Sequence, residues 1–518
     1  MAITRRELIR LMSCAGSAVA LSGLGIAEAV TGSSAGGPFV PTRESLKSYQ
    51  IPQWFRDAKF GIWAHWGPQS AIEAGDWYAR NMYIQDSEQY KYHVAHYGHP
   101  SKVGYKDLVG KWHASKFDPD HLMSLYKKAG AKYFVSMGVH HDNFDLWNSK
   151  HTRWNSVNMG PKKDIVGLWR DAARKQGLKF GVSEHLWISY KWFAVSHGSD
   201  KTGPFAGIPY DGIDPKYADL YYSYADRDAA KFIANLDWND DDIPDSFRRH
   251  YLDRMTDLID NYQPDFLYTD GHLPFEKYGL EMVSHLYNVS AKLHGTCQAV
   301  YTTKEQLDCA VGTCVQDHER GVADGILPNP WQTDTCIGDW HYNRGKQYKT
   351  AKKVIDMLVD IVSKNGNLLL SLPLPNSGEL DSEELKVLDG ITTWMAINSE
   401  GIYSSRPWKI YGVGPSTEAK MGESRFNEDK RGDFTAEDVR FTTKGKDIYA
   451  FVMGWPEGSA LIKPLATNSP QQPGKIQNVE MLGYKGTLRW KQDANGLRVE
   501  MPERKVSDIG FTLKVHGV

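Results

Sequence analysis

The sequence predicts a (β/α)8-type barrel followed by a small C-terminal antiparallel β-sandwich. Between residues 46 and 407, short apolar runs alternate with amphipathic helical stretches, which is the pattern of a parallel sheet covered by helices. About eight such runs fall within this length, as a closed barrel requires. From 408 to 518 the chain changes to short β-prone runs separated by turns. We therefore expect a large barrel domain at 46–407, of the kind that carries catalytic sites, and a second domain at 408–518.

The barrel strands are predicted where apolar, β-branched and aromatic residues form short runs. In chain order these runs are 59–66, 132–140, 178–184, 265–269, 298–302, 313–316, 333–337 and 367–372. Helices are expected between several of them, for example at 164–176 and 247–261. In such a barrel the catalytic groups lie at the carboxyl ends of the strands. Polar or charged residues stand at those ends here: His65, His140, His141, Asp142, Glu184, His185, Asp270, Glu319 and Asp339.

The predicted C-terminal domain has a different texture. Its β-prone runs are 440–443, 448–453, 487–490 and 511–515. Asn495 and Gly496 form the Asn-Gly pair that favours a tight hairpin turn. The spacing of the runs is typical of a small antiparallel β-sandwich.

Residues 1–29 have the pattern of a bacterial twin-arginine export signal. Arg5 and Arg6 precede a weakly apolar, uncharged stretch, and Ala27 and Ala29 are small residues at the positions that a signal peptidase reads. The apolar stretch is too short and too rich in Gly and Ser to span a bilayer. Cys14 lies in a lipobox-like context, which leaves lipidation as the alternative. We expect an exported protein, periplasmic or extracellular.

After the predicted signal, residues 30–45 are small and polar and are expected to form a linker. Four cysteines follow, at spacings that match no zinc ribbon or finger: Cys297, Cys309, Cys314 and Cys336. The sequence leaves a disulfide among them open. It gives no sign of a cofactor and does not indicate an oligomeric state.

Composition restricts the partners. The formal charge of −2, from 61 basic and 63 acidic residues, gives no reason to expect nucleic acid or an anionic membrane as a partner. The chain contains 17 Trp and 27 Tyr, whose apolar faces and polar edges suit sugar rings. Large folds also use these residues in their cores, so this observation favours sugar binding only slightly.

Two carboxylates are candidates for acid–base chemistry. Asp270 ends the strand at 265–269 and is followed by Gly271, so it is expected to project into the central pocket, although a turn or helix cap would use the same pair. Glu319 follows a later strand end, and a surface ion pair with Arg320 is the alternative. Glycoside hydrolysis needs two carboxyl groups that flank the bond. Asp270 and Glu319 could form such a pair.

The adjacent residues His140 and His141 suggest a metal site at first sight. Neighbouring residues on a strand point to opposite faces, so regular strand geometry does not let both bind one ion. We favour sugar hydroxyls over a metal as their ligands, and a hydrogen-bonded core histidine stays an alternative. Asp76 and Trp77 offer a carboxylate acceptor and an indole N–H donor, which together can hold a ring hydroxyl. Trp340 adds an aromatic face near another predicted strand end.

The chain also carries, in this order, the motifs KFGIWAHWG, GDWYARNM, GAKYFVSMGVHHDNFDLWNS, RWNSVNMGPKKDIVG, YTDG, PWQTDTCIGDWHY, VSKNGNLLLSLPL and GIYSSRPWKIYGVGP. This series, from about residue 50 to 412, resembles the α-L-fucosidases of glycoside hydrolase family 29, and the β-rich tail resembles that family's C-terminal domain. The resemblance implies an exo-hydrolase that releases terminal α-L-fucose with retention, through a covalent glycosyl-enzyme.

By the same resemblance, Asp270 matches the nucleophile of similar enzymes. Positions that bind fucose in those enzymes correspond to His65, Trp77, His140 and His141. The family's acid/base is placed variably in sequence, and Glu319 is our choice from its offset and its DHERG context. The implied partner is a fucosylated oligosaccharide or glycoconjugate, with no nucleic acid and no stable membrane association.

The sequence departs from the family pattern at several positions. Asn143 stands in HHDNF where glycine is usual, and Tyr268 in YTD where Trp is common. In the family pattern this strand end contains a tyrosine, and GVSEHL stands in its place here. Glu184 and His185 are therefore expected to line a different pocket wall. Gln332 replaces a common Glu. These departures leave open an exo-glycosidase for another L-sugar, such as α-L-galactose, and a non-catalytic carbohydrate-binding protein is the second alternative.

Overall fold

The structure is a computed structural model that describes residues 37–224, 229–234, 236–310, 312–418, 426–428 and 432–517. The predicted export signal at 1–29 and the first part of the predicted linker lie outside the described residues. Within them, no helix is both long enough and apolar enough to cross a membrane.

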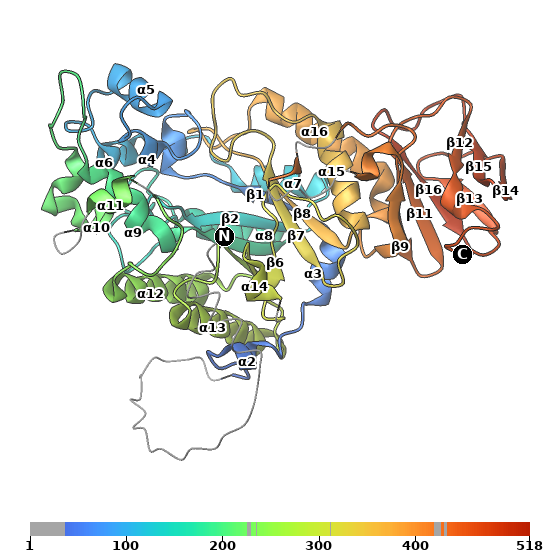
Figure 1. The fold of residues 1–518 in the computed structure, drawn as a ribbon, viewed down its shortest axis with the longest axis horizontal. Helices are drawn as coiled ribbons and strands as arrows, with labels where there is room; N and C mark the ends of the chain where they lie inside the picture. The colour runs from blue at the N-terminus through green and yellow to red at the C-terminus, as the bar shows by residue number, and fades with distance from the viewer. Residues whose placement is uncertain are drawn as a thin grey trace, which may run out of the picture. The chain divides into compact units, whose positions relative to one another are not determined.

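Eight strands form one parallel sheet, in the order β6-β5-β4-β3-β2-β1-β8-β7 (Figure 1). They are β1 (Phe60–Ala64), β2 (Tyr133–Val139), β3 (Lys179–Glu184), β4 (Phe266–Thr269), β5 (Val300–Thr303), β6 (Val315–Gln316), β7 (Trp331–Cys336) and β8 (Gly366–Ser371). Each overlaps a strand predicted from the sequence. Between β6 and β7 the only β-bridge among the described residues joins Asp317 to Gln332. The barrel is therefore nearly closed, and we call the β6–β7 junction the seam.

Helices alternate with these strands, as the sequence predicts for a barrel. The α-helices of the barrel are α2 (Arg43–Leu46), α3 (Gln53–Ala58), α4 (Tyr78–Asn81), α5 (Glu88–His96), α6 (Tyr105–Leu108), α7 (Pro119–Lys128), α8 (Ile165–Lys175), α9 (Ser189–Trp192), α10 (Ala218–Tyr221), α11 (Ala229–Ala234), α12 (Asp245–Tyr262), α13 (Lys277–His294), α14 (Gln306–Cys309), α15 (Ala351–Ser363) and α16 (Ser382–Asn398). The predicted helices at 164–176 and 247–261 are α8 and α12.

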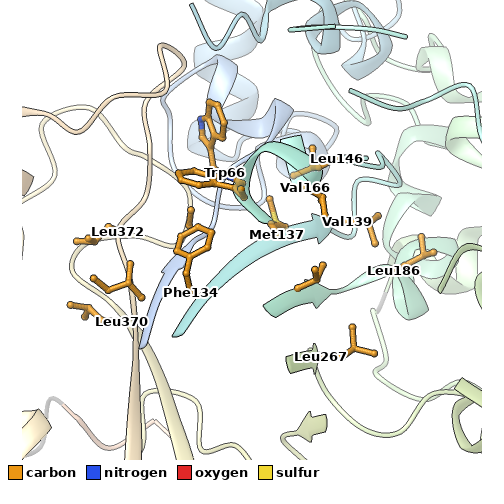
Figure 2. Close-up of a cluster of buried hydrophobic side chains, with 14 of the residues drawn as sticks. Trp66, Phe134, Met137, Val139, Leu146, Val166, Leu186, Leu267, Leu370 and Leu372 are labelled. Carbon is orange, nitrogen blue, oxygen red and sulfur yellow. The ribbon is translucent and has the colours of Figure 1, made fainter. Parts of the chain in front are cut away.

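Alternate residues of the strands pack into two different apolar clusters, because successive side chains point to opposite faces. One cluster lies between the strands and the helices, and Figure 2 shows part of it, with Phe134 and Leu370 among side chains such as Val166. The other fills the barrel interior and includes Trp63, Tyr133, Val135, Phe266, Tyr268, Val300, Val315 and Leu369. The interior set fixes which strand-end residues can reach the barrel mouth.

Beside the barrel mouth, Arg254 of α12 forms a buried ion pair with Asp145. Its Nη1 also donates to the Asn143 side-chain oxygen at 2.6 Å. Asn143 has a φ of 59°, a left-handed conformation that glycine and asparagine adopt more easily than other residues. The backbone conformation therefore explains why asparagine can replace glycine in HHDNF, and its side chain supports α12 by accepting from Arg254.

Replacing Arg254 with methionine is expected to lower the free energy of unfolding by about 3–5 kcal/mol, because Asp145 is left buried without its cation. Urea denaturation followed by circular dichroism measures this change. The control is Arg249→Met on the same helix, which removes a solvent-exposed pair with Asp245 and should change stability little. Equal stabilities of the two variants would contradict the prediction.

The C-terminal residues form two antiparallel sheets, ordered β13-β16-β11-β10-β9 and β12-β15-β14. The strands are β9 (Arg406–Val413), β10 (Val439–Lys444), β11 (Asp447–Val452), β12 (Ser459–Ile462), β13 (Asn478–Met481), β14 (Trp490–Asp493), β15 (Gly496–Glu500) and β16 (Phe511–His516). Their shared core includes Phe441, Ile462, Leu497 and Leu513. A hairpin joins β14 to β15 close to the predicted turn, but its two connecting residues are Ala494 and Asn495, because Gly496 already pairs with Asp493. The expected second, antiparallel domain is confirmed.

Candidate active site

A pocket of about 630 Å³ opens at the carboxyl ends of the barrel strands. Residues that line it include Trp63, His65, Asp76, Trp77, His140, His185, Trp187, Trp238, Tyr268, Asp270, Lys304, Glu319, Asp334 and Trp340. All the residues predicted from the sequence to form the site are among them, except His141 and Glu184. Several apolar ring faces thus surround a group of carboxylates and imidazoles.

The Asp270 carboxylate lies beside one ammonium group and two imidazoles. Lys304 Nζ donates to its Oδ1 at 2.5 Å, and His185 Nδ1 donates to its Oδ2 at 2.9 Å. His141 Nε2 lies 3.3 Å from the same Oδ2. Burial alone would raise the pKa of Asp270, but the Lys304 charge and the two histidines outweigh it and hold the pKa well below its ordinary value. Asp270 is therefore ionised throughout the neutral range.

Gly271 explains how Asp270 is oriented. The Trp187 indole N–H donates to the Asp270 carbonyl, so the ring lies directly against this turn. Gly271 has a φ of 115°, and a Cβ there would lie 2.8 Å from the Trp187 ring. Only glycine meets both conditions without strain.

Glu319 shares the Lys304 ammonium with Asp270. Lys304 Nζ donates to Glu319 Oε2 at 2.5 Å, the same distance as to Asp270 Oδ1. Those two oxygens can therefore be no more than 5.0 Å apart. Carboxyl groups about 5–5.5 Å apart are the arrangement of retaining glycosidases, whereas inverting enzymes keep them roughly 6.5–9.5 Å apart to admit a water.

The protonation of Glu319 differs from that of Asp270. Burial raises the pKa of Glu319 to about 7, and the negative charges of Asp334 and Asp270 add to this while Lys304 opposes it. One carboxyl group of the pair is thus ionised and the other holds a proton in mildly acidic solution. Attack on the anomeric carbon requires an ionised carboxylate, and protonation of the leaving group requires a protonated carboxyl group, so the pair meets both requirements.

The imidazoles around the pocket are held in defined tautomers. Gln69 Oε1 accepts from the Ala79 N–H, so its Nε2 donates to His140 Nδ1 at 2.9 Å. His140 therefore carries its proton on Nε2 and is a donor. His185 instead gives its Nδ1 proton to Asp270, which leaves Nε2 as an acceptor with no partner in the described structure. Each sugar hydroxyl can bridge one donor and one acceptor of this kind.

Two groups of side chains bring potential metal-ligand atoms within 4.8 Å of one another: His65, Asp76, His140 and His341, and His140, His141 and His185. Both include His140, whose Nδ1 is occupied by Gln69 and whose Nε2 carries a proton. The lone pair of this neutral imidazole is on Nδ1, where it already accepts the Gln69 N–H, so His140 does not offer it to a cation. His140, which belongs to both groups, therefore suits a hydroxyl group better than a metal ion.

Residues 26–400 match the sequence model described as Alpha-L-fucosidase, and residues 431–516 match that of the Alpha-L-fucosidase C-terminal domain. The chain belongs to the alpha-L-fucosidase family. As a member, it is a glycoside hydrolase, an α-L-fucosidase. Members of this family retain the anomeric configuration through a covalent intermediate.

Among its relatives, the human tissue alpha-L-fucosidase is 26% identical over 514 residues, which are 96% of this chain and 95% of that protein. The human plasma alpha-L-fucosidase is 26% identical over 486 residues, 91% of this chain and 90% of its own. The crystal structure of Thermotoga maritima alpha-fucosidase in complex with fucose superposes with a TM-score of 0.68 at 25% identity, covering 92% of this chain and all of that one.

In this α-L-fucosidase, the expected site residue Glu184 does not line the pocket. It is fully buried, accepts from the Tyr251 hydroxyl at 2.8 Å and accepts from the Leu186 N–H at 3.0 Å. Phe180 and Val182 belong to the outer cluster, so Glu184 on the same strand face also points outward, whereas His185 points inward. His141 also lies outside the lining, but it is buried and its Nε2 lies 3.3 Å from Asp270 Oδ2.

The sequence prediction missed several residues that line the fucosidase pocket, namely Lys304, Asp334, Trp63, Trp187 and Trp238, and it missed His341, which contacts the pocket residue Asp76. Lys304 follows the end of β5 directly, so the strand-end rule that identified Asp270 would have found it. His341 Nδ1 donates to Asp76 Oδ1 at 2.7 Å. Asp76 therefore receives its donor from a residue that is distant in sequence, which no local pattern indicates.

Proposed function

We propose that Asp270 is the nucleophile and Glu319 the acid/base with which this α-L-fucosidase releases terminal fucose from glycans. The observation that carries the proposal is the Lys304 bridge, which holds an ionised and a protonatable carboxyl group at the separation suited to retention. Asp270 attacks the anomeric carbon while Glu319 gives its proton to the leaving oxygen. Glu319 then removes a proton from the water that hydrolyses the glycosyl-enzyme.

The other pocket residues bind and orient the sugar in this proposal. His65, buried and without a partner on either ring nitrogen in the described structure, and His140 supply hydrogen bonds to ring hydroxyls. Burial lowers the pKa of both imidazoles well below its ordinary value, so they bind as neutral groups. Trp77 and Trp340 add apolar faces at the rim. The substrates in this proposal are fucosylated oligosaccharides or glycoconjugates.

We expect nitrophenyl α-L-fucoside to be hydrolysed faster than nitrophenyl α-L-galactoside, with α-L-fucose as the first product. Proton NMR during the first minutes identifies the anomer before mutarotation mixes the two. Release of β-L-fucose first would contradict the retaining pair. Faster hydrolysis of the galactoside would move the substrate to another L-sugar, and binding of fucose without turnover would reject catalysis.

The export prediction accompanies this function. The twin-arginine pattern of residues 1–29 supports a site of action outside the cytoplasm, in the periplasm or beyond the cell. Fractionation of cells that produce the full chain tests it, with the Arg5→Lys, Arg6→Lys double variant as the control expected to stay inside.

A further inference from the structure

Behind Glu319 and Lys304 lie two further carboxyl groups that the proposed mechanism does not use. Asp317 precedes Glu319 by two residues, and Asp334 is on β7 across the seam. Their exposed fractions are 1% and 0%. The bridge between Asp317 and Gln332 places both strands in parallel register, so Asp317, Glu319 and Asp334 all face the barrel interior. We call Asp317 and Asp334 the acid pair.

Each member of the acid pair has one satisfied oxygen and one unsatisfied oxygen. Gln332 Nε2 donates to Asp317 Oδ2 at 2.7 Å, and the Tyr268 hydroxyl donates to Asp334 Oδ2 at 2.8 Å. The Oδ1 atoms of both residues are buried and have no donor among the described residues. The Asp334 carboxyl group lies close enough to Asp317 for its charge to raise the pKa of Asp317. Two ionised carboxylates in contact would repel strongly inside a protein.

A single proton between them removes both difficulties. A protonated carboxyl group gains an O–H donor, so one Oδ1 can donate to the other. Burial, and then the charge of Asp334, raises the pKa of Asp317 well above its ordinary value, which makes Asp317 the residue that carries the proton. The lone negative charge of the pair then lies on the Asp334 side, which is the member that lines the pocket.

We propose that Asp317 and Asp334 share one proton and present a single fixed negative charge to Lys304 and Glu319, which sets the upper pH limit at which Glu319 can act as the acid. This inference rests on the proposed role of Glu319. The acid pair touches no reacting atom, so its members are positioning residues that act through Lys304 and Glu319.

The charges that face Glu319 come from three strands. Lys304 follows β5 and contacts Glu319, Asp270 follows β4, and Asp334 lies on β7. The acid pair itself faces the neutral hydroxyl of Tyr268 and the amide of Gln332, and beyond them the Lys304 charge. Loss of the Glu319 proton therefore adds a negative charge beside two that are already present. Removing the charge at Asp334 makes that loss easier.

The test compares Asp334→Asn with Asp317→Asn in the full-length enzyme. Asparagine preserves the shape of the side chain and can hydrogen-bond to the remaining carboxyl group, so both variants should keep the wild-type melting temperature. Burial keeps Asp317 protonated in Asp334→Asn, so no other negative charge replaces the one that is removed. Asp334→Asn removes the charge from the pocket wall, and the upper limb of the kcat/KM–pH profile should move down by about one pH unit. Asp317→Asn leaves Asp334 ionised, and the limb should move by less than about 0.3 pH units.

Infrared difference spectroscopy at pH 7 tests the shared proton directly. The stretch of a buried protonated carboxyl group should disappear in Asp317→Asn relative to the wild type. An unchanged band, or equal limb shifts in the two variants, would overturn the acid pair. The kcat/KM–pH profile of Glu319→Gln tests the role of Glu319 separately from the shared proton of the acid pair. If its upper limb persists, Glu319 is not the acid, whatever the infrared spectra show.

Discussion

Replacing Asp270 with alanine is expected to reduce kcat on nitrophenyl α-L-fucoside by on the order of 10⁴-fold or more, with the fold intact. The reason is that Asp270 is the carboxylate that lies beside Lys304, His185 and His141 together, the position from which we propose that the anomeric carbon is attacked. The residue is at a strand end, where truncation leaves the barrel ladder in place. Steady-state kinetics measure the loss, and circular dichroism checks the fold.

Azide provides the diagnostic for the nucleophile. The small anion can enter the space left by the Asp270 side chain and attack the same carbon, so it should restore part of the turnover and give a β-fucosyl azide. The control is Asp265→Ala at the opposite end of β4, whose carboxylate pairs with Lys179 and lies outside the pocket. Wild-type turnover in Asp270→Ala, or a comparable loss in Asp265→Ala, would refute the assignment.

Replacing Glu319 with alanine is expected to give a loss that depends on the leaving group. Fucosides with a poor alcohol leaving group need its proton and should react about 10²–10⁴-fold more slowly. Dinitrophenolate is a good leaving group that departs without protonation, so the first step on dinitrophenyl fucoside should lose little of its rate. Rates measured over a series of aryl fucosides give the dependence, and an equal loss for every leaving group would exclude the acid role.

The pH profile makes the same assignment from another direction. Glu319 acts as an acid only while protonated, and its pKa is raised to about 7. Wild-type kcat/KM should therefore be highest below this value and fall as the pH rises through it. Asp270, with its lowered pKa, stays ionised over that range and adds no limb there. In Glu319→Ala the fall near pH 7 should vanish.

Much of the barrel could be predicted because its strands are short, apolar and followed by polar residues. The alternation of side chains along each strand would also have predicted which strand-end residues point into the barrel. Once Phe266 and Tyr268 are placed inside, Asp270 must point inward, and Val300 places Lys304 inside in the same way. The same rule turns Glu184 outward and His185 inward. The expectation that Glu184 lines the pocket treated Glu184 and His185 alike, although adjacent residues on a strand point to opposite faces.

Other features could not be predicted, for two different reasons. The disulfide between Cys309 and Cys314 is local, yet nothing in the spacing of four cysteines selects it over other pairings. The pairing of His341 with Asp76 depends on how loops after β7 and β1 meet. The Lys304 bridge requires three strand ends to converge on one ammonium group. The last two features join segments far apart in the chain, so they follow from the nearly closed barrel and not from local sequence.

Because of the seam between β6 and β7, the strands that precede Asp270 and Glu319 are held by different numbers of neighbouring strands. Asp270 follows a strand paired on both sides, whereas Glu319 follows a two-residue strand whose outer neighbour is reached through one bridge. Lengthening or shortening the β6 segment would therefore break few ladder bonds. An enzyme built this way can have its proton donor relocated along the chain, and so be adapted to new leaving groups, while the machinery that captures the sugar stays in place.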